Sequence, residues 1–369
     1  MHNENRSPAA RAPHAPLLRM AKRKDVSRGG AVGVRTLSIV LALLTGSIFL
    51  LLMGDNPLHV YAKMLVGSVG NKNTALTTVK SAIPLVIASL GVCLAFKMKF
   101  WNIGAEGQML IGATAATYFA LFHSDWPQIW LLTAMFVASF AAAGLWGMIP
   151  AFFKVRFRTN ETLFTLMMNY VALNLITALK GGAWRDPTAH GFNQIAQFAA
   201  SARLPRVGGV HAGWIIALAL AAIVYVYMKH SKGGYELAVV GESENTARYA
   251  GMNVRAIVLR TMLLSAGICG IAGMVQASGA TGTLTETVSG GAGFTAIIIA
   301  WLSQLSPIAV VAVSFLFSMM ERGGAFIQQA FKIPATAANI LEGIILLFVL
   351  GGEFFIHYKL IPGRRARHG

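Results

Sequence analysis

The sequence predicts an all-α integral membrane protein with about ten transmembrane helices and both termini in the cytoplasm. Apolar residues make up 55% of the 369 residues, only 12% are charged, and the mean hydropathy is +0.60. These values are typical of membrane proteins rather than soluble domains. Apolar runs recur along the chain, and many of its 31 lysines and arginines stand at the ends of these runs, as the positive-inside rule requires of a multi-pass protein.

The chain begins with a basic segment, 1–35, which we predict to be a disordered cytoplasmic tail. It is polar, and no small-residue cleavage site follows the first apolar run cleanly. We therefore interpret that run as an uncleaved first span and not as a signal peptide. At the other end, 358–369 predicts a second basic cytoplasmic tail, and 36–357 forms one transmembrane domain between the two.

A spanning helix needs about 20 mostly apolar residues, and ten segments approach or meet this requirement. Ser303 to Pro307 barely separate the eighth and ninth segments, so these two could instead form a re-entrant pair or one broken helix. The predicted spans are 36–53, 74–96, 107–122, 129–153, 161–180, 213–228, 257–278, 293–305, 307–321 and 338–357.

The second and third spans are joined by a short turn with an unusual sequence, NIGAEGQ. Asn102 and Gly104 predict a tight reversal of the chain. Glu106 falls in the first turn of the next helix, where its charge suits the helix dipole, and Gly107 allows close helix contact. Gln108 completes the string.

A polar island, 229–260, lies between two apolar runs and contains a short helix that we predict over 241–252. Ser243 is the expected N-cap and Gly251 the expected left-handed C-cap residue. Glu244 and Arg248 are spaced for an ion pair. The charge distribution places this island in the cytoplasm. The residues of the predicted helix are Gly241, Glu242, Ser243, Glu244, Ala247, Arg248, Tyr249, Ala250 and Gly251.

Polar residues inside a bilayer are costly, so we treat them as candidates for the solute path. Uncharged amides suit a ligand with hydroxyls and a base, because they both donate and accept hydrogen bonds; alternatively, they bond neighbouring helices. The run 279–292 is neither helix-forming nor apolar and predicts an external gate. The candidates are Asn169, Asn174, Gln276, Glu286 and Glu342.

The residue patterns exclude several functions. There is no Walker A motif, no paired-carboxylate or Ser/His/Asp catalytic constellation, and no nucleic-acid-binding motif. Cys93 and Cys269 both lie in apolar runs, which predicts buried packing residues and no disulfide or metal site. We therefore expect a chain that is not an enzyme, binds no cofactor or metal of its own, and takes its energy from another protein.

Five blocks of the chain resemble one family in order and spacing. FWNIGAEGQMLIGA is similar to the signature of permease subunits of bacterial ATP-binding-cassette importers, in the group for branched-chain amino acids, ribose and nucleosides. The blocks at 160–175, 237–279, 290–310 and 339–350 continue the resemblance, which spans roughly 57–357. Within the group, NIGAEGQ and MMNY resemble the nucleoside type. The chain departs from the family at 301–304, which leaves the solute less certain.

The resemblance implies a permease subunit in the bacterial inner membrane, which moves a nucleoside by alternating access. Its expected partners are a second permease subunit, a cytoplasmic ATPase that binds ATP and Mg²⁺, an extracytoplasmic solute-binding protein and membrane lipid. The 241–252 helix would be the coupling helix that rests on the ATPase. Ala247, Tyr249, Ala250 and Met252 offer it an apolar docking surface.

Three alternatives remain at this stage. A simple-sugar permease would show the same motifs. An ion-coupled secondary transporter would be expected to carry acidic coupling sites at mid-membrane and inverted repeats, and we found only Glu342 as a clear acidic candidate. A membrane-embedded enzyme would need the catalytic residues that the sequence lacks.

Overall fold

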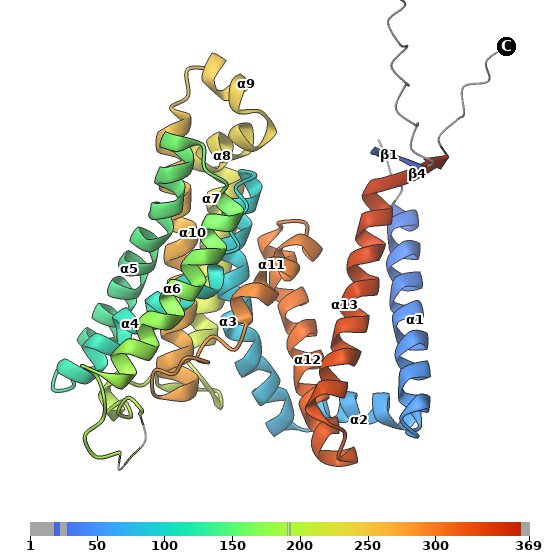
Figure 1. Ribbon diagram of the computed structural model, residues 1–369, viewed down its shortest axis with the longest axis horizontal. Coiled ribbons are helices and arrows are strands. Elements are labelled where there is room, and N and C mark those ends of the chain that lie inside the picture. Colours follow the sequence, from blue (N-terminus) through green and yellow to red (C-terminus); the bar gives the residue numbers. More distant parts are fainter. Residues whose placement is uncertain (1–17, 23–27, 190, 192, 363–369) are drawn as a thin grey trace, which may run out of the picture. The chain divides into compact units, whose positions relative to one another are not determined.

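The computed structural model describes residues 18–22, 28–189, 191 and 193–362, and these are mostly helical (Figure 1). An all-α architecture is thereby confirmed. The described chain divides into a larger unit, 58–338, and a smaller unit formed by 1–57 together with 339–369. We describe each unit separately.

The larger unit contains most of the helices and one two-stranded sheet. Its main helices follow the predicted spans closely, with ends that differ by up to about ten residues. The elements are α2 (Pro57–Val69), α3 (Lys72–Lys97), α4 (Ala105–Phe122), α5 (Gln128–Phe157), α6 (Glu161–Gly181), η1 (Ala200–Ala202), β2 (Arg206–Val207), β3 (Val210–His211), α7 (Gly213–His230), α8 (Lys232–Glu242), α9 (Glu244–Tyr249), α10 (Val254–Gln276), η2 (Ala277–Thr281), α11 (Ala292–Leu302) and α12 (Pro307–Phe331).

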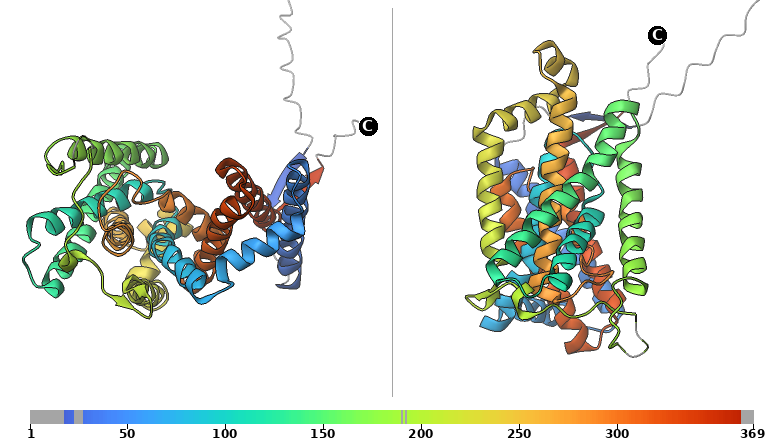
Figure 2. Two further views of the ribbon diagram at one scale, coloured as in Figure 1. Left: turned by 90° about the horizontal axis from the view of Figure 1, so that it is seen from below. Right: turned by 90° about the vertical axis from the view of Figure 1, so that its left-hand side faces the viewer.

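The core of the larger unit is built around α3 and α10. In the most apolar stretches of these helices, 83% of the residues in α3 and 78% of those in α10 are buried. Helix α10 packs against α3, α4 and α5, and Figure 2 shows it lying among these helices. The buried stretches, 82–96 in α3 and 265–275 in α10, are apolar or small on every side, which is the pattern of a helix surrounded by other helices.

Glycine allows α4 and α10 to approach closely. A Cβ atom on Gly273 would lie 1.9 Å from the carbonyl oxygen of Met109, and one on Gly112 would lie 2.3 Å from that of Gly270. Both obstacles are backbone atoms, which cannot rotate away. Small residues at such contacts are how membrane helices gain close packing where the hydrophobic effect between helices is weak.

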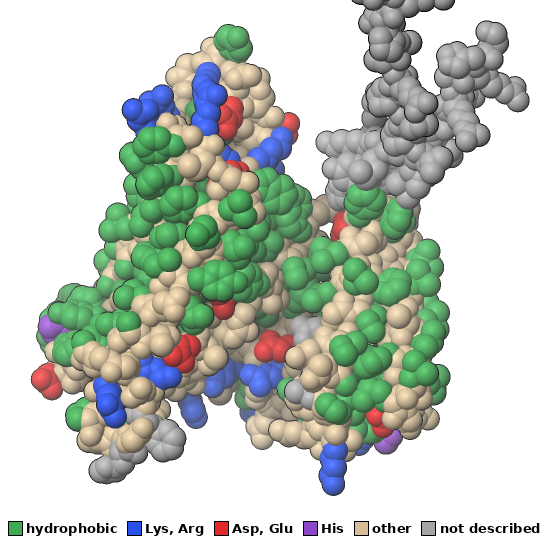
Figure 3. All heavy atoms as spheres, in the orientation of Figure 1, with side chains coloured by type: hydrophobic (Ala, Val, Ile, Leu, Met, Phe, Trp, Pro, Cys, Tyr) green, Lys and Arg blue, Asp and Glu red, His purple; other side chains and the backbone are tan. Residues whose placement is uncertain are grey.

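The outer helices show the opposite pattern of burial. Only 28% of the apolar stretch of α5 and 22% of that of α6 is buried, and their large apolar side chains cover the flank seen in Figure 3. Exposed apolar patches of this size are not found on soluble monomers. Eight helices of the described chain are long and apolar enough to cross a bilayer, which confirms a multi-pass membrane protein.

Two of the ten predicted spans fall outside these eight, for different reasons. Helix α4 begins with Glu106 and Gln108, which lower its mean hydropathy. Helix α11 has 11 residues and is therefore about 17 Å long, roughly half the thickness of a bilayer core. A turn at Ser303–Ser306 separates it from α12, so the two are distinct helices and not one broken helix.

The smaller unit consists of β1 (Leu18–Lys22), α1 (Arg28–Leu52), α13 (Ala335–His357, from residue 339) and β4 (Tyr358–Pro362). Strands β1 and β4 pair in antiparallel register, and Arg35 forms an ion pair with Glu353 at 2.6 Å. The first helix thus begins earlier than residue 36, and a strand lies within the segment predicted to be a disordered tail. That pairing joins opposite ends of the chain, so local sequence does not reveal it. Residues 1–17, 23–27 and 363–369 lie outside the described residues.

Candidate functional site

The helix predicted in the polar island is present as α9, which follows α8 at one end of the larger unit (Figure 1). The Ser243 side chain accepts a hydrogen bond from the backbone N–H of Thr246 at 3.2 Å, which confirms it as the N-cap. Gly251 has φ +74°, as a left-handed C-cap residue should. Glu244 and Arg248 form the expected ion pair at 3.5 Å. The predicted helix start at Gly241 belongs instead to the end of α8.

The exposed surface of α9 differs from the predicted docking surface in one residue. The Tyr249 side chain is 93% exposed, whereas Ala247 is fully buried. Ala247 therefore cannot take part in a docking contact, because it packs inward as part of the helix's own attachment. A partner that covers the Tyr249 side chain would remove its apolar surface from water, which favours binding. Tyr249 and the neighbouring Ala250 remain available to such a partner.

Helix α8 ties α9 to both core helices. A Cβ atom on Gly241 would lie 2.1 Å from the Lys97 carbonyl oxygen, so the last turn of α8 rests on the end of α3. The Lys99 ammonium donates to the Glu242 carbonyl at 3.4 Å. The Arg260 guanidinium of α10 donates to Glu236 of α8 at 2.7 Å. A displacement of α9 would consequently reach α3 and α10 through direct contacts.

The NIGAEGQ turn forms a buried hydrogen-bond cluster, which we call the signature cluster. The side chains of Asn102 and Gln108 pair reciprocally, with both donor–acceptor distances 3.1 Å. The Asn102 oxygen also accepts from the Gly104 N–H at 3.0 Å, which confirms the tight reversal. Both amides are almost completely buried, and reciprocal pairing satisfies them without water.

The signature cluster continues into α6 through Asn169. Its side-chain oxygen accepts from the Gly107 N–H at 2.8 Å, and its nitrogen donates to the Ile103 carbonyl at 2.9 Å. Thr165, one turn earlier, accepts from the Ile103 N–H at 3.2 Å. Asn169 is only 5% exposed. The amide that we predicted for the solute path thus uses these bonds to hold the start of α4 against α6.

Glu106 connects the signature cluster to α11. One carboxylate oxygen accepts from the Ser289 hydroxyl and from the Gly291 N–H at 3.1 Å, and the other accepts from the Gly293 N–H at 2.8 Å. The sequence predicted that Glu106 would serve the dipole of its own helix. Glu106 does lie in the first turn of α4, and its carboxylate also reaches the N-terminus of α11, where free N–H groups and the dipole both favour an anion.

The remaining path candidates lie apart from one another. Asn174 is on α6 and donates to the carbonyl of Tyr170 in the same helix at 2.9 Å. Gln276 ends α10 and is half-buried. Glu286 lies in the irregular segment 282–291, where its carboxylate accepts from Lys180 at 2.9 Å and Thr177 at 3.1 Å. Glu342 is in α13, and its side chain lies outside the described part of the structure.

The hydrogen bond from Lys180 holds the pKa of Glu286 below its ordinary value, so this carboxylate is charged at neutral pH. The pair joins the segment 282–291 to the end of α6. The ion pair is thus a polar link between a helix and irregular backbone. Irregular backbone inside a membrane must be covered by protein or face water.

Sequence reasoning missed several charged residues. Lys80 lies within the apolar run 74–96, and Glu321 and Arg322 lie in the middle of α12. Arg203, Arg206 and His211 lie between the fifth and sixth predicted spans and were not predicted as site residues. A charge inside an apolar run was the available signal.

The sequence matches a known family of transport proteins. The profile of the branched-chain amino acid transport system permease component matches residues 74–350. The chain belongs to this permease family. The matched region contains the signature cluster, α9 and the core helices, so the permease fold accounts for each of them.

Individual relatives of this permease are similar along most of its length. It is 32% identical to the glucose ABC transporter permease protein TsgB13 of Haloferax volcanii, over 93% of each chain. It is 31% identical to the guanosine ABC transporter permease protein NupP of Bacillus subtilis, over 86% of this chain and 92% of the relative. A second guanosine permease of that organism, NupQ, is 27% identical over 78% and 90% of the two chains.

Proposed function

We propose that this chain is the permease subunit of an ATP-binding-cassette importer for a nucleoside in a bacterial inner membrane. Relatives named for guanosine and for glucose transport place it in the nucleoside and sugar branch, and the NIGAEGQ and MMNY blocks favour the nucleoside type. A simple sugar is the second candidate, because the TsgB13 match is as extensive as the NupP match.

The observation that carries the mechanism is the attachment of α9. Tyr249 is exposed for a partner, while contacts through α8 reach the ends of α3 and α10. In the proposed complex, two ATPase subunits bind ATP and Mg²⁺ and close on one another. That closure would push α9, move the core helices and open the solute path toward one side, and release of ADP would reverse the motion.

The partners follow from the same mechanism. An ATPase must dock on α9, and a solute-binding protein must deliver solute at the opposite end. Bacillus subtilis has two guanosine permease proteins, both similar to this chain, which supports a second, related permease subunit. The apolar flanks of α5 and α6 would face lipid.

Uptake by the reconstituted complex tests this function. The complete transporter in vesicles with internal ATP should import radiolabelled guanosine in preference to glucose. The double variant Arg248→Ala, Tyr249→Ala should insert normally but lose most ATP-driven uptake, because the docking surface is removed. Tyr170→Ala is the matched control, since Tyr170 is a 62% exposed tyrosine on α6. Full uptake by the double variant, or uptake that a protonophore abolishes at constant ATP, would contradict the proposal.

A further inference from the structure

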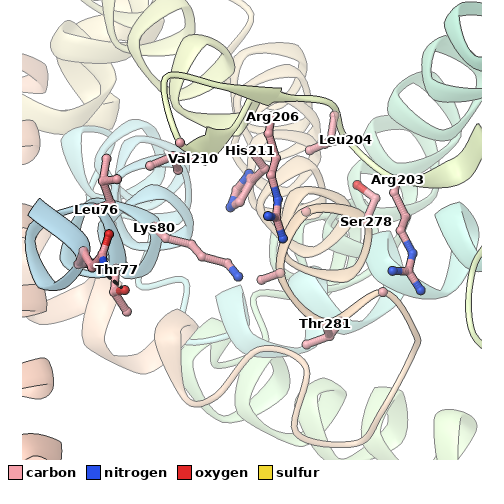
Figure 4. Close-up of a pocket in the computed structure, with 15 residues that line it drawn as sticks. Leu76, Thr77, Lys80, Arg203, Leu204, Arg206, Val210, His211, Ser278 and Thr281 are labelled. Carbon is pink, nitrogen blue, oxygen red and sulfur yellow. Dashed lines mark hydrogen bonds between the residues drawn. The ribbon is translucent and has the colours of Figure 1, made fainter. Parts of the chain in front are cut away.

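A hollow with a volume of about 420 Å³ lies beside the end of α10 that is farther from α9 (Figure 4). Figure 1 shows that this end of α10 is opposite α9. The walls of the hollow come from α3, from the β2–β3 hairpin and the residues just before it, and from η2, which follows α10. The volume is within the range of about 300–1,000 Å³ that small-molecule sites occupy. We call this hollow the cationic vestibule, because Lys80, Arg203, Arg206 and His211 line it.

The charges of the vestibule are not balanced by acids. Among the described residues that line it there is no aspartate or glutamate. Lys80 and Arg206 make no ion pair in the described part of the chain. Arg203 donates to the Phe198 carbonyl at 3.1 Å and to the Gln197 side chain at 3.2 Å. Both acceptors are neutral, so its positive charge also remains uncompensated.

Figure 4 shows the Lys80 ammonium and the Arg206 guanidinium pointing into the same space. Like charges that converge in this way repel one another unless an anion lies between them. Lys80 is half-buried, so water screens its charge less than that of a surface lysine. The arrangement is therefore unfavourable when empty and favourable around a bound anion.

His211 is an independent indication of a ligand. It is only 3% exposed, yet neither ring nitrogen has a hydrogen-bond partner. Buried polar side-chain atoms in native proteins are rarely left unpaired. The imidazole lines the vestibule beside Lys80 and Arg206, as Figure 4 shows. An oxygen atom of a ligand in the vestibule could accept a hydrogen bond from it.

We propose that the cationic vestibule binds the phosphate group of a phosphorylated nucleoside or sugar. Three permanent cations suit a group with a charge of about −1.5 to −2 better than a single carboxylate. Phosphate offers three strong acceptor oxygens, and arginine is well shaped to bind them. The proposal rests on the proposed nucleoside or sugar import, and it adds phosphate esters of these compounds to the solutes expected to bind.

Binding to the purified permease is the first test, with guanosine 5′-monophosphate as the probe and guanosine as its uncharged counterpart. At matched ionic strength the monophosphate should bind more tightly. Lys80→Met and Arg206→Gln should each weaken its binding by about tenfold or more, because each removes a charge-assisted hydrogen bond. Lys72→Met is the matched control. Lys72 is an exposed lysine on the same helix and does not line the vestibule, so its variant should bind as the wild type does.

Competition with inorganic phosphate and with vesicles of phosphatidylglycerol shows whether the vestibule binds a soluble phosphate or a lipid headgroup. The monophosphate should compete with free phosphate in the wild type, and lipid should not displace it. Displacement by lipid alone would show a headgroup site and overturn the proposal. It would also be overturned if the variants left monophosphate binding unchanged and weakened only the salt-dependent docking of the solute-binding protein.

Uptake separates this inference from the proposed function. The complete transporter should import the monophosphate, and the ratio of monophosphate to guanosine uptake should fall in Lys80→Met. Import of guanosine with no binding or import of the monophosphate would overturn the inference and leave the proposed function intact. Monophosphate binding to the permease without ATP-driven uptake of either compound would support the vestibule and contradict the proposed function.

Discussion

Glu106 shows how one side chain can hold distant parts of a membrane fold together. It begins α4, yet its carboxylate bonds to Ser289, Gly291 and Gly293, up to 187 residues later in the chain. Ser289 and Gly293 are buried, so water cannot readily replace the carboxylate as their acceptor. The signature cluster therefore places the short helix α11, and its unusual sequence reflects this structural demand.

Removing the Glu106 carboxylate should destabilise the permease. In Glu106→Ala three donors lose their acceptor, each at a cost of about 1–3 kcal/mol if it stays buried and unpaired. We expect a clear drop in the apparent Tm of the detergent-purified protein. Glu242→Ala is the control, because Glu242 is exposed. Equal Tm values for the two variants would show that the α11 contact contributes little.

His211 should make the stability of the permease depend on pH. Burial, and secondarily the nearby Lys80 charge, lower its pKa from 6.5 to about 4. Between these values the unfolded state binds more protons than the folded state, so stability should fall as pH decreases from about 6.5 to about 4. Apparent Tm measured across this range should show that loss in the wild type and a smaller one in His211→Gln. Parallel curves for the two proteins would refute this assignment.

At the scale of elements, helix existence and caps could be predicted, whereas long-range partners could not. Apolar runs gave the main helices, and local rules gave Ser243 and Gly251 their correct roles, because both signals lie within a few residues. The sequence left open whether Asn169 serves the solute path or bonds a neighbouring helix, and it gave no sign that the Glu106 carboxylate reaches α11. Their partners, Gly107 and Gly293, are distant in sequence and are reached only when three helices have packed.

The close contact between α4 and α10 should tolerate no added carbon atom at Gly273. In Gly273→Ala the Cβ would lie 1.9 Å from the Met109 carbonyl oxygen, so the helices must separate. We expect lower yield of folded protein and a reduced apparent Tm. Gly343→Ala is the matched control, because a Cβ there meets nothing within 4 Å, and alanine favours helix. A normal Tm for Gly273→Ala would contradict the packing described.

At the scale of the whole molecule, the all-helical membrane architecture was predictable from composition and hydropathy alone, because lipid imposes those constraints on every residue. The number of membrane-spanning helices was harder to predict, because α11 is too short and α4 too polar to satisfy a rule based on length and hydropathy. The cationic vestibule was not predicted, because its charges come from α3 and from the β2–β3 region, segments that had been interpreted separately.

The predicted topology can be tested with single added cysteines. Cys93 and Cys269 are both fully buried, so the native protein should give little background reaction. With α9 in the cytoplasm, Asn245→Cys should react with a membrane-impermeant maleimide only after cells are permeabilised. Asn193→Cys, at an exposed position in the long loop before α7, should react in intact cells once the reagent crosses the outer barrier. The reverse pattern would invert the orientation we propose.

The shortness of α11 has a consequence for how the protein is made. Segments are recognised for membrane insertion over windows of about 19 residues, and an 11-residue helix preceded by irregular backbone does not fill one. Helix α11 should therefore enter the bilayer only together with α12, after α3 and α4, on which it packs, have already been synthesised. By then Glu106 is already part of the inserted chain, so this part of the fold is completed when the N-terminus of α11 docks on the Glu106 carboxylate.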